Sequence, residues 1–370
     1  MVKKRKILIC IPSFTFGGAE VHSYYTGKAL QADSNTEVCF LAFGKIDSFK
    51  KKLEEEGFKT LHFSINDFMT LSVIDKLHAL IRLFFFLKPY QFQYIFSATE
   101  QSNLLMGIVW KLLKVKKYFW QQWGVGNQTN VGFWEKLAVS SKPYYIANSN
   151  ACRSYIEKRH RIENPREVKI IHNTFNERLL KLFPNLQSTP FNLLMLANFF
   201  PEKDHITVLK AFKLFLNKYP NSEANLFFAG SAPGKSLALL QAKSVAFDLG
   251  LCNHVIFTGR VEDVSPLLSS SHVGILSTTS EGLSNALLEY MAAGLPIIAT
   301  DIPQNREALG EMNTEGLFTI GDDQQCFLLM EKLYLDKELR GSIGKRNYDF
   351  VQKTFSFEIY KKQILDLINS

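Results

Sequence analysis

Residues 273–300 read VGILSTTSEGLSNALLEYMAAGLPIIAT, and this stretch predicts a strand, a loop, a helix and a second strand in succession. Val273–Leu276 is a short apolar run, which is typical of a strand buried on both faces of a parallel sheet. A small polar loop follows, then a helix over Asn285–Ala292, and Pro296–Ala299 is again short and apolar. Because two strands joined through a helix form a βαβ unit, this stretch alone favours an α/β fold.

The loop of this unit carries residues that suit an anionic ligand. The helix begins near Ser284 or Asn285, either of which can cap it, and free N–H groups at a helix start attract a diphosphate. Gly282 lets the backbone approach such a ligand closely. Glu281 lies just before the helix and Glu289 about one turn inside it, so the two can flank one ligand. Because carboxylates repel a diphosphate, we expect them to meet hydroxyl groups. The alternative is an ordinary amphipathic helix with two exposed acids.

The same alternation of strands and helices runs through the rest of the chain. Further strands are predicted at residues 6–11, 36–43, 94–97, 117–121, 144–148, 168–171, 192–197, 224–229 and 255–258. A polar stretch with prolines, 183–190, predicts a linker. We therefore expect two doubly wound, Rossmann-like α/β domains over 1–182 and 191–352, and a terminal helix over 353–370 that crosses back to the first domain. Ligands of such sheets bind at the carboxyl ends of the strands, so the expected site is the cleft between the domains.

Composition agrees with two domains and limits the partners. A chain of 370 residues, 46% of them apolar, can build two cores of about 150–200 residues each. Residues 1–180 hold 26 Lys and Arg against 15 Asp and Glu, whereas residues 181–370 hold 17 against 20. A basic first half indicates an anionic partner, which can be nucleic acid, a membrane surface or a phosphorylated substrate. Nucleic acid is the least favoured of these, since no recognised binding motif accompanies the charge.

Cysteine usage and hydrophobicity indicate the compartment. The five cysteines are scattered without a CxxC pair, which argues against a disulfide framework or a zinc site. The basic N-terminus is followed only by the apolar run Ile7–Pro12, too short for a signal peptide. Leu71–Leu87 is too short and too charged to span a bilayer. We expect a cytoplasmic protein, or one held peripherally at the inner membrane surface.

With its preceding strand, its EG pair and the MAAGLPIIAT run after it, the stretch around Glu281 and Glu289 resembles the retaining glycosyltransferases of family 4, glycosyl transferases group 1. These enzymes have the GT-B fold of two Rossmann-like domains, and their hallmark is two glutamates with seven residues between them. The resemblance implies that Glu281 contacts the hydroxyls of the donor sugar and Glu289 those of the ribose. Backbone amides at the helix start would hold the diphosphate: Gly282, Leu283, Ser284 and Asn285.

Two further stretches of the second half match the same family in order. Lys203, in the loop after strand 192–197, fits the family lysine on the donor phosphates; a solvated loop lysine is the alternative. Asn198 stands where the family usually has an arginine, and this departure removes a bidentate phosphate clamp. Arg260 and Val261 match the loop whose backbone meets the nucleobase, although a plain strand-to-helix turn explains them equally well.

The first half also resembles the family, with departures. Gly17 and Gly18 follow the first strand, where a GG loop of the family approaches the donor phosphate and the acceptor; the alternative is a tight turn with Glu20 near a helix start. This is not a G-x-G-x-x-G motif, so a nicotinamide cofactor is unsupported. Many members carry a histidine in the loop that corresponds to residues 118–124, and none is present here. Candidate acceptor contacts are instead Trp123, Gln122 and Glu100, for each of which a core or surface role is the alternative. His22 is interpreted as a partly exposed polar contact.

The resemblance implies a reaction. A nucleotide-diphosphate sugar, with uridine as the expected nucleoside, would be the co-substrate; Lys203 and Glu281 would be catalytic, and no metal or other cofactor is expected. The acceptor would be a saccharide or lipid-linked saccharide of a cell-surface polysaccharide, and the runs Ile81–Phe86 and Trp110–Lys117 would contact an anionic membrane. A basic helix face in ordinary solvent is the alternative to that contact. The rival function is a nucleotide-sugar-binding protein without turnover, which Asn198 and the missing histidine favour.

Overall fold

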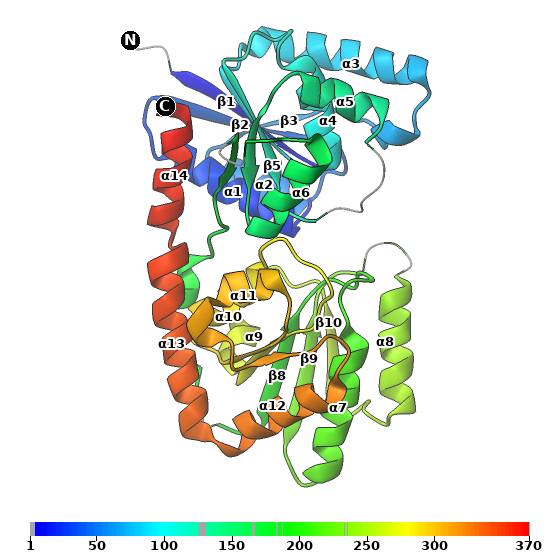
Figure 1. Cartoon of the computed structure of the whole chain (residues 1–370), viewed down its shortest axis with the longest axis vertical. Coiled ribbons are helices and arrows are strands. Elements are labelled where there is room, and N and C mark those ends of the chain that lie inside the picture. Colours follow the sequence, from blue (N-terminus) through cyan, green and yellow to red (C-terminus); the bar gives the residue numbers. More distant parts are fainter. Residues whose placement is uncertain are drawn as a thin grey trace. The chain divides into compact units, whose positions relative to one another are not determined.

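The computed structural model describes residues 4–125, 131–164, 167–182, 184–186, 188–232, 234 and 236–369. Its contacts divide the chain into two compact units. The first comprises residues 1–174 together with 357–370, and the second comprises residues 175–356. Each unit is an α/β structure in its own right (Figure 1).

The described residues of the first unit form a seven-stranded sheet in which all neighbouring strands are parallel, in the order β3-β2-β1-β4-β5-β6-β7. The strands are β1 (Arg5–Ile11), β2 (Thr36–Ala42), β3 (Lys59–His62), β4 (Tyr94–Ala98), β5 (Lys117–Gln122), β6 (Tyr144–Ala147) and β7 (Val168–Ile170). The helices are α1 (Gly18–Gln31), α2 (Ser48–Glu55), α3 (Val73–Leu87), α4 (Glu100–Val109), α5 (Phe133–Ser140), α6 (Asn150–His160) and α14 (Phe357–Asn369).

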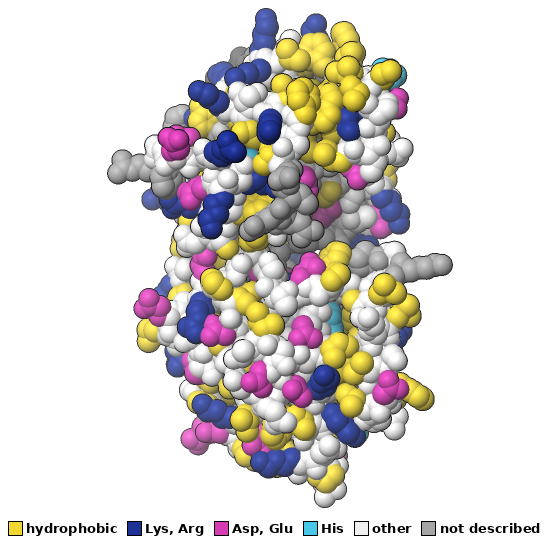
Figure 2. Space-filling view, turned by 45° about the vertical axis from the view of Figure 1, so that its right-hand side comes forward, with side chains coloured by type: hydrophobic (Ala, Val, Ile, Leu, Met, Phe, Trp, Pro, Cys, Tyr) yellow, Lys and Arg dark blue, Asp and Glu magenta, His cyan; other side chains and the backbone are white. Residues whose placement is uncertain are grey.

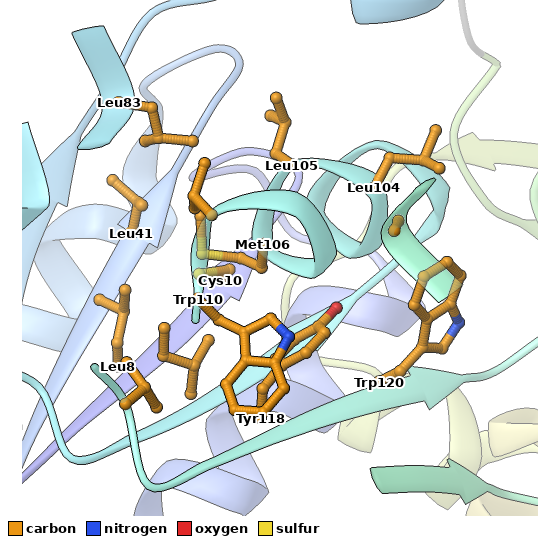
Figure 3. Packing of buried hydrophobic residues seen from close by; sticks show 14 of the residues in the cluster. Leu8, Cys10, Leu41, Leu83, Leu104, Leu105, Met106, Trp110, Tyr118 and Trp120 are labelled. Carbon is orange, nitrogen blue, oxygen red and sulfur yellow. The ribbon is translucent and has the colours of Figure 1, made fainter. Parts of the chain in front are cut away.

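The side chains of strand β1 show why helices cover both faces of this sheet. They alternate between two faces, with Ile7 and Ile9 in one hydrophobic cluster and Leu8 and Cys10 in the other. All four are fully buried. Figure 3 shows the second cluster, in which Leu8 and Cys10 lie against helix α4 and neighbouring strands. Because both faces are apolar, helices must cover both, as a parallel sheet requires.

The second unit repeats the plan with a six-stranded parallel sheet, in the order β10-β9-β8-β11-β12-β13. Its strands are β8 (Phe191–Leu196), β9 (Ala224–Ala229), β10 (Val255–Gly259), β11 (Val273–Leu276), β12 (Ile297–Thr300) and β13 (Leu317–Phe318). Its helices are α7 (His205–Lys218), α8 (Leu237–Asp248), α9 (Ser265–Ser270), α10 (Asn285–Ala292), α11 (Pro303–Leu309), α12 (Asp323–Leu335) and α13 (Lys337–Phe355).

Both strand orders are those of a doubly wound Rossmann-like sheet, which confirms the predicted fold class. In each sheet the chain order reverses at one point, between β1 and β4 in the first and between β8 and β11 in the second. Ligands of such folds bind at the carboxyl ends of the strands beside this switch point. The loop after β8 holds Lys203 and the loop after β11 holds Glu281.

The chain passes from the first unit to the second between Thr174 and Phe175, ahead of the stretch 183–190 that the sequence predicts as a linker. The reason is packing: Phe175 is buried with Leu287 and its neighbours in a cluster of the second unit. Phe183 and Gln187 of the predicted linker lie outside the described residues. The chain returns to the first unit after Ser356, and the terminal helix α14 packs on α1 there.

Candidate functional site

Two loops at the switch point of the second sheet are joined by their backbones. The amide of Asp204 donates to the carbonyl of Ser277 at 3.0 Å, and the amide of Thr279 donates to the carbonyl of Glu202 at 2.9 Å. Lys203 and Thr278 pair between these two hydrogen bonds as an antiparallel β-bridge. The loop after β8 and the loop after β11 therefore form one rigid edge, although about 75 residues separate them along the chain.

Lys203 and Glu281 meet at this edge. The ammonium of Lys203 forms an ion pair with the Glu281 carboxylate, and both side chains are largely buried, with 15% and 13% of their surface exposed. An ion pair so shielded from water is screened less than one on an open surface, and loss of either partner leaves the other charge buried without compensation. The structure thus brings together the two residues that the sequence predicts as catalytic.

Threonine hydroxyls hold the Glu281 loop from behind, a role that the sequence analysis missed. Thr300, at the end of β12, accepts a hydrogen bond from the amide of Thr278 at 3.1 Å and donates one to its carbonyl at 2.7 Å. The hydroxyl of Thr278 in turn donates to the carbonyl of Glu202 at 3.1 Å. The only sequence signal is the pair of small polar residues at strand ends, which is too common to single them out.

Tyr290 of α10 is a second contact that the sequence did not predict. Its buried hydroxyl donates to the carbonyl of Ile275 at 3.1 Å and accepts from the amide of Leu196 at 2.6 Å. A Cβ at Gly274 would lie only 2.4 Å from the Tyr290 ring, so glycine is required there. Tyr290 therefore fixes α10 against β8 and β11, the two strands from which the site loops emerge.

The start of helix α10 presents backbone donors to the same edge. Ser284 occupies the N-cap position, one of the two that the sequence predicts, and its side chain makes no capping hydrogen bond. The first amides of a helix have no partner within the helix, and the helix dipole adds partial positive charge there. Leu283 is buried in the core with its side chain, so only its backbone faces the loop; Gly282 precedes it. Asn285 is the first helical residue.

Glu289 differs in its environment from Glu281. It lies in α10, is only partly exposed, and its carboxylate has no hydrogen-bond or ion-pair partner within the described part of the chain. Burial raises the pKa of this carboxyl from 4.5 to about 7. A carboxylate without such a partner is available to accept hydrogen bonds from hydroxyl groups.

The remaining predicted residues of this unit lie on neighbouring strand ends. The Asn198 carbonyl oxygen accepts hydrogen bonds from the amide and the hydroxyl of Ser231, at 2.8 and 2.9 Å, so half of this side chain ties two loops together. Its amide nitrogen has no partner among the described residues and can still donate. Arg260, 3.8 Å from Glu262, and Val261 follow β10, which β9 separates from β8.

In the first unit the predicted residues lie at the carboxyl edge of its sheet. Gly17 is the N-cap of α1 and Gly18 its first residue. A Cβ at Gly17 would lie 2.5 Å from a carboxylate oxygen of Glu20, so the glycine leaves room for this acid at the helix start. Glu20 also accepts a hydrogen bond from the Ser13 hydroxyl at 2.9 Å. A protein carboxylate therefore lies at the start of α1, as the tight-turn alternative requires.

The candidate acceptor residues follow β4 and β5. Glu100 is exposed at the start of α4, directly after Thr99, whose φ of 77° is unusual for a β-branched residue. Gln122 donates to the carbonyl of Gly124 at 2.7 Å. Trp123 is partly exposed and stacks on His22. His22 itself is buried, so its interpretation as a partly exposed contact is wrong.

Solved structures of other proteins share this arrangement. Two Rossmann-like units in one chain, each with a doubly wound parallel sheet, correspond to the GT-B fold. HepE of Anabaena, solved in complex with UDP and glucose, has the same fold: its TM-score is 0.84 at 18% identity, over 99% of this chain and 100% of that one. At this identity the likeness concerns the fold.

Residues 180–350 match the family described as glycosyl transferases group 1. The match covers 171 of the 370 residues, all of them in the second unit, and over this part the chain is similar to that family. N-acetyl-alpha-D-glucosaminyl L-malate synthase of Bacillus anthracis is 25% identical over 214 residues, 55% of this chain and 54% of that protein. The putative glycosyltransferase EpsD of Bacillus subtilis is 32% identical over 143 residues, 39% of this chain and 36% of that protein. The chain thus spans about half or less of the length of these relatives.

The described residues contain no group of three or more His, Cys, Asp and Glu side chains that could hold a metal ion. Within the same ranges, none of the helices combines the length and the apolar character needed to cross a bilayer.

Proposed function

We propose that this protein transfers a sugar from a UDP-sugar to an acceptor hydroxyl with retention of anomeric configuration, as the family 4 resemblance implies. The observation that carries the proposal is the shielded Lys203–Glu281 pair at the switch point, next to the start of α10. A cation and an acid at one edge, followed by the start of a helix that carries a second acid, match the chemical groups of a nucleotide-diphosphate sugar. HepE, which shares the fold, binds UDP and glucose.

Each group has a task in this proposal. Lys203 and the amides of Gly282–Asn285 stabilise the charge that develops on the departing diphosphate. Glu281 accepts hydrogen bonds from the donor-sugar hydroxyls and Glu289 from the ribose hydroxyls. The acceptor hydroxyl attacks the anomeric carbon from the face that the leaving group vacates, and the leaving phosphate takes its proton. Catalysis then depends on leaving-group electrostatics and on holding the acceptor close. Lys203 must exchange its partner Glu281 for a phosphate when the donor binds.

A panel of nucleotide sugars tests this function. The first step is thermal shift with UDP and UDP-sugars, and the second is release of UDP from the sugar that binds. We expect Lys203→Ala and Glu281→Ala to lower turnover by at least about 100-fold with the fold intact, as loss of one electrostatic catalytic contact does. Lys210→Ala, at an exposed lysine of α7, is the matched control and should behave as the wild type. Binding of a UDP-sugar without any release of UDP would instead favour the non-catalytic binding protein.

The proposed acceptor is a saccharide, free or lipid-linked, and the surface of α3 favours the lipid-linked form. Five apolar side chains of this helix are exposed, Ile74 by 78% and Phe85 by 62%. They form one stripe, the α3 apolar face: Val73, Ile74, Leu77, Ile81 and Phe85. Figure 2 shows hydrophobic side chains gathered at the upper end of the view, with Lys and Arg around them. The basic charge of the first half of the chain complements an anionic bilayer.

The exposed residues differ from the two runs that the sequence predicts for this contact. Within the run Ile81–Phe86, Leu83 points into the core, whereas the exposed stripe extends back to Val73. In the run Trp110–Lys117, Trp110 is buried and its indole N–H donates to the Ser141 hydroxyl at 2.7 Å. Trp110 therefore belongs to the core, and we assign the membrane contact to the α3 apolar face.

Liposome flotation tests the membrane contact. We expect the wild type to float with vesicles that contain phosphatidylglycerol and not with pure phosphatidylcholine. Leu77→Asp together with Phe85→Asp should abolish flotation, because each puts a charge on the α3 apolar face. Leu240→Asp changes a leucine of α8 that is 60% exposed in the second unit, and it is the matched control. Equal flotation of both variants would exclude α3 as the contact.

A further inference from the structure

His22 and Trp123 form a stacked pair at the carboxyl edge of the first sheet. Trp123 directly follows β5, and His22 lies near the start of α1. Their ring centroids are 4.2 Å apart and the rings are inclined by only 20°. The family resemblance leads us to expect a histidine in the loop that holds Trp123. In this chain the imidazole next to that loop belongs to His22 of helix α1 instead.

The imidazole is fixed from behind by the terminal helix. The hydroxyl of Tyr360, in α14, lies 3.4 Å from Nδ1 of His22 and 2.7 Å from the hydroxyl of Thr26. His22 and Tyr360 are 4% and 3% exposed. Because α1 and α14 enclose it, the His22 ring cannot turn away from the indole.

Hydrogen bonding holds one side of the His22 ring, through the hydroxyl of Tyr360 and the side chain of Asn173. The Nε2 atom of His22 is buried and has no hydrogen-bond partner within the described part of the chain. Burial lowers the pKa of His22 to about 4, so the ring is neutral near pH 7. A neutral imidazole whose Nε2 makes no hydrogen bond interacts with its neighbours mainly through its flat face. In His22 this face is the one that stacks on Trp123.

Trp123 is fixed on one face by His22 and is partly exposed to solvent. Its indole N–H has no hydrogen-bond partner among the described residues, and its side chain is partly exposed. The hydrogen bond from Gln122 to the carbonyl of Gly124 fixes the turn that carries it. An aromatic ring held on one face, whose N–H makes no hydrogen bond within the described ranges, suits a pyranose, which has an apolar C–H face and hydroxyls at its rim.

We propose that Trp123 is the stacking platform for a pyranose ring of the acceptor and that His22 is the positioning residue that holds this platform. The proposal rests on the glycosyltransferase function proposed above and names the acceptor side of the same reaction. The pair is assigned to the acceptor because Trp123 and His22 lie in the first unit, whereas Lys203, Glu281 and Glu289, which are proposed to bind the donor, lie in the second. Simple packing of Trp123 against His22 is the competing explanation.

Fluorine NMR of the full chain labelled with 5-fluorotryptophan separates the two explanations without any need for turnover. The chain has four tryptophans, and Trp123→Phe identifies the resonance of Trp123. The probes are methyl glucosides and methyl N-acetylglucosaminides. We expect the probe that binds to shift the Trp123 resonance in a saturable manner and to leave the other three in place. Should none of these pyranosides move that resonance, the platform is refuted.

Variants of His22 then test positioning. His22→Asn removes the ring and keeps a polar group near Nδ1, whereas His22→Phe keeps the ring and removes both nitrogens. We expect His22→Asn to shift the Trp123 resonance without ligand and to weaken pyranoside binding about 3- to 10-fold, the worth of one aromatic contact. His22→Phe should restore binding to near the wild-type value. If His22→Phe loses as much as His22→Asn, a nitrogen of His22 contacts the ligand and the positioning role is overturned.

Kinetics provide the second readout. With the donor identified by thermal shift, we expect Trp123→Ala to raise KM for the pyranoside and to leave the UDP dissociation constant and donor hydrolysis unchanged. Trp123→Phe should lie between Trp123→Ala and the wild type. Unchanged pyranoside KM in Trp123→Ala, with only stability reduced, would establish simple packing. If the wild type neither binds UDP nor hydrolyses a UDP-sugar, the proposed function fails, and the NMR titration still decides the platform.

Discussion

Glu289 is the best place to test the electrostatics of the site, because its carboxyl is shielded from water and has no partner among the described residues. The perturbation is Glu289→Gln, which keeps the shape and removes the charge. Burial raises the pKa of this carboxyl from 4.5 to about 7. Since the folded protein binds the proton more tightly than the unfolded chain, stability from this group is complete below pH 4.5 and is lost as the pH rises through about 7.

The magnitude follows from that displacement. For one group whose pKa rises from 4.5 to about 7 on folding, the free energy of unfolding falls by roughly 2–3 kcal/mol between about pH 5 and pH 8. The glutamine variant lacks this dependence. We therefore expect Glu289→Gln to be about as stable as the wild type at pH 5 and more stable by roughly 2–3 kcal/mol at pH 8.

Urea unfolding at the two pH values measures this difference. Far-UV circular dichroism follows the whole chain, whereas tryptophan fluorescence follows only the first unit, because all four tryptophans lie there. Fluorescence therefore serves as an internal control for a change in the second unit. Glu338→Gln, at an exposed acid of α13, removes the same charge and is the matched variant. A wild-type–Glu289→Gln stability difference that is the same at both pH values would refute the reasoning.

Two further predictions concern the contacts that hold the site together. Lys203→Met leaves the carboxylate of Glu281 without its partner, so we expect this variant to destabilise the protein by about 1–3 kcal/mol. The double variant with Glu281→Gln should recover most of this loss in a double-mutant cycle measured by urea unfolding. Additive effects of the two substitutions would contradict a coupled pair. Tyr290→Phe removes the hydroxyl that accepts a hydrogen bond from the amide of Leu196 and donates one to the carbonyl of Ile275. We expect thermal unfolding to show a free energy of unfolding lower by about 1–3 kcal/mol. A melting curve identical to that of the wild type would show that these hydrogen bonds contribute nothing.

The features that depend only on neighbouring residues could be predicted from the sequence. Strand β11 and helix α10 have the predicted bounds, Val273–Leu276 and Asn285–Ala292, because apolar run length and helical spacing are properties of neighbouring residues. The alternation of strands and helices also fixed the fold class, since parallel strands require crossover helices. Lys203 and Glu281 could be paired in advance only through the family resemblance, which supplies the order of loops along the chain.

Other contacts depend on residues that meet only after folding. Tyr290 reaches Leu196 and Thr278 reaches Thr300 because the switch point brings β8, β11 and β12 side by side, and neither pair has a spacing that a local pattern could reveal.

By itself, the sequence determined two doubly wound sheets and the residues at one end of their strands, because hydrophobic periodicity acts over a few residues. Only the tertiary structure decided where the chain leaves the first unit, since that depends on which core buries Phe175. It also decided that His22 stacks on Trp123 and that α14 packs against α1 and His22, because these contacts join residues about 100 to 340 positions apart.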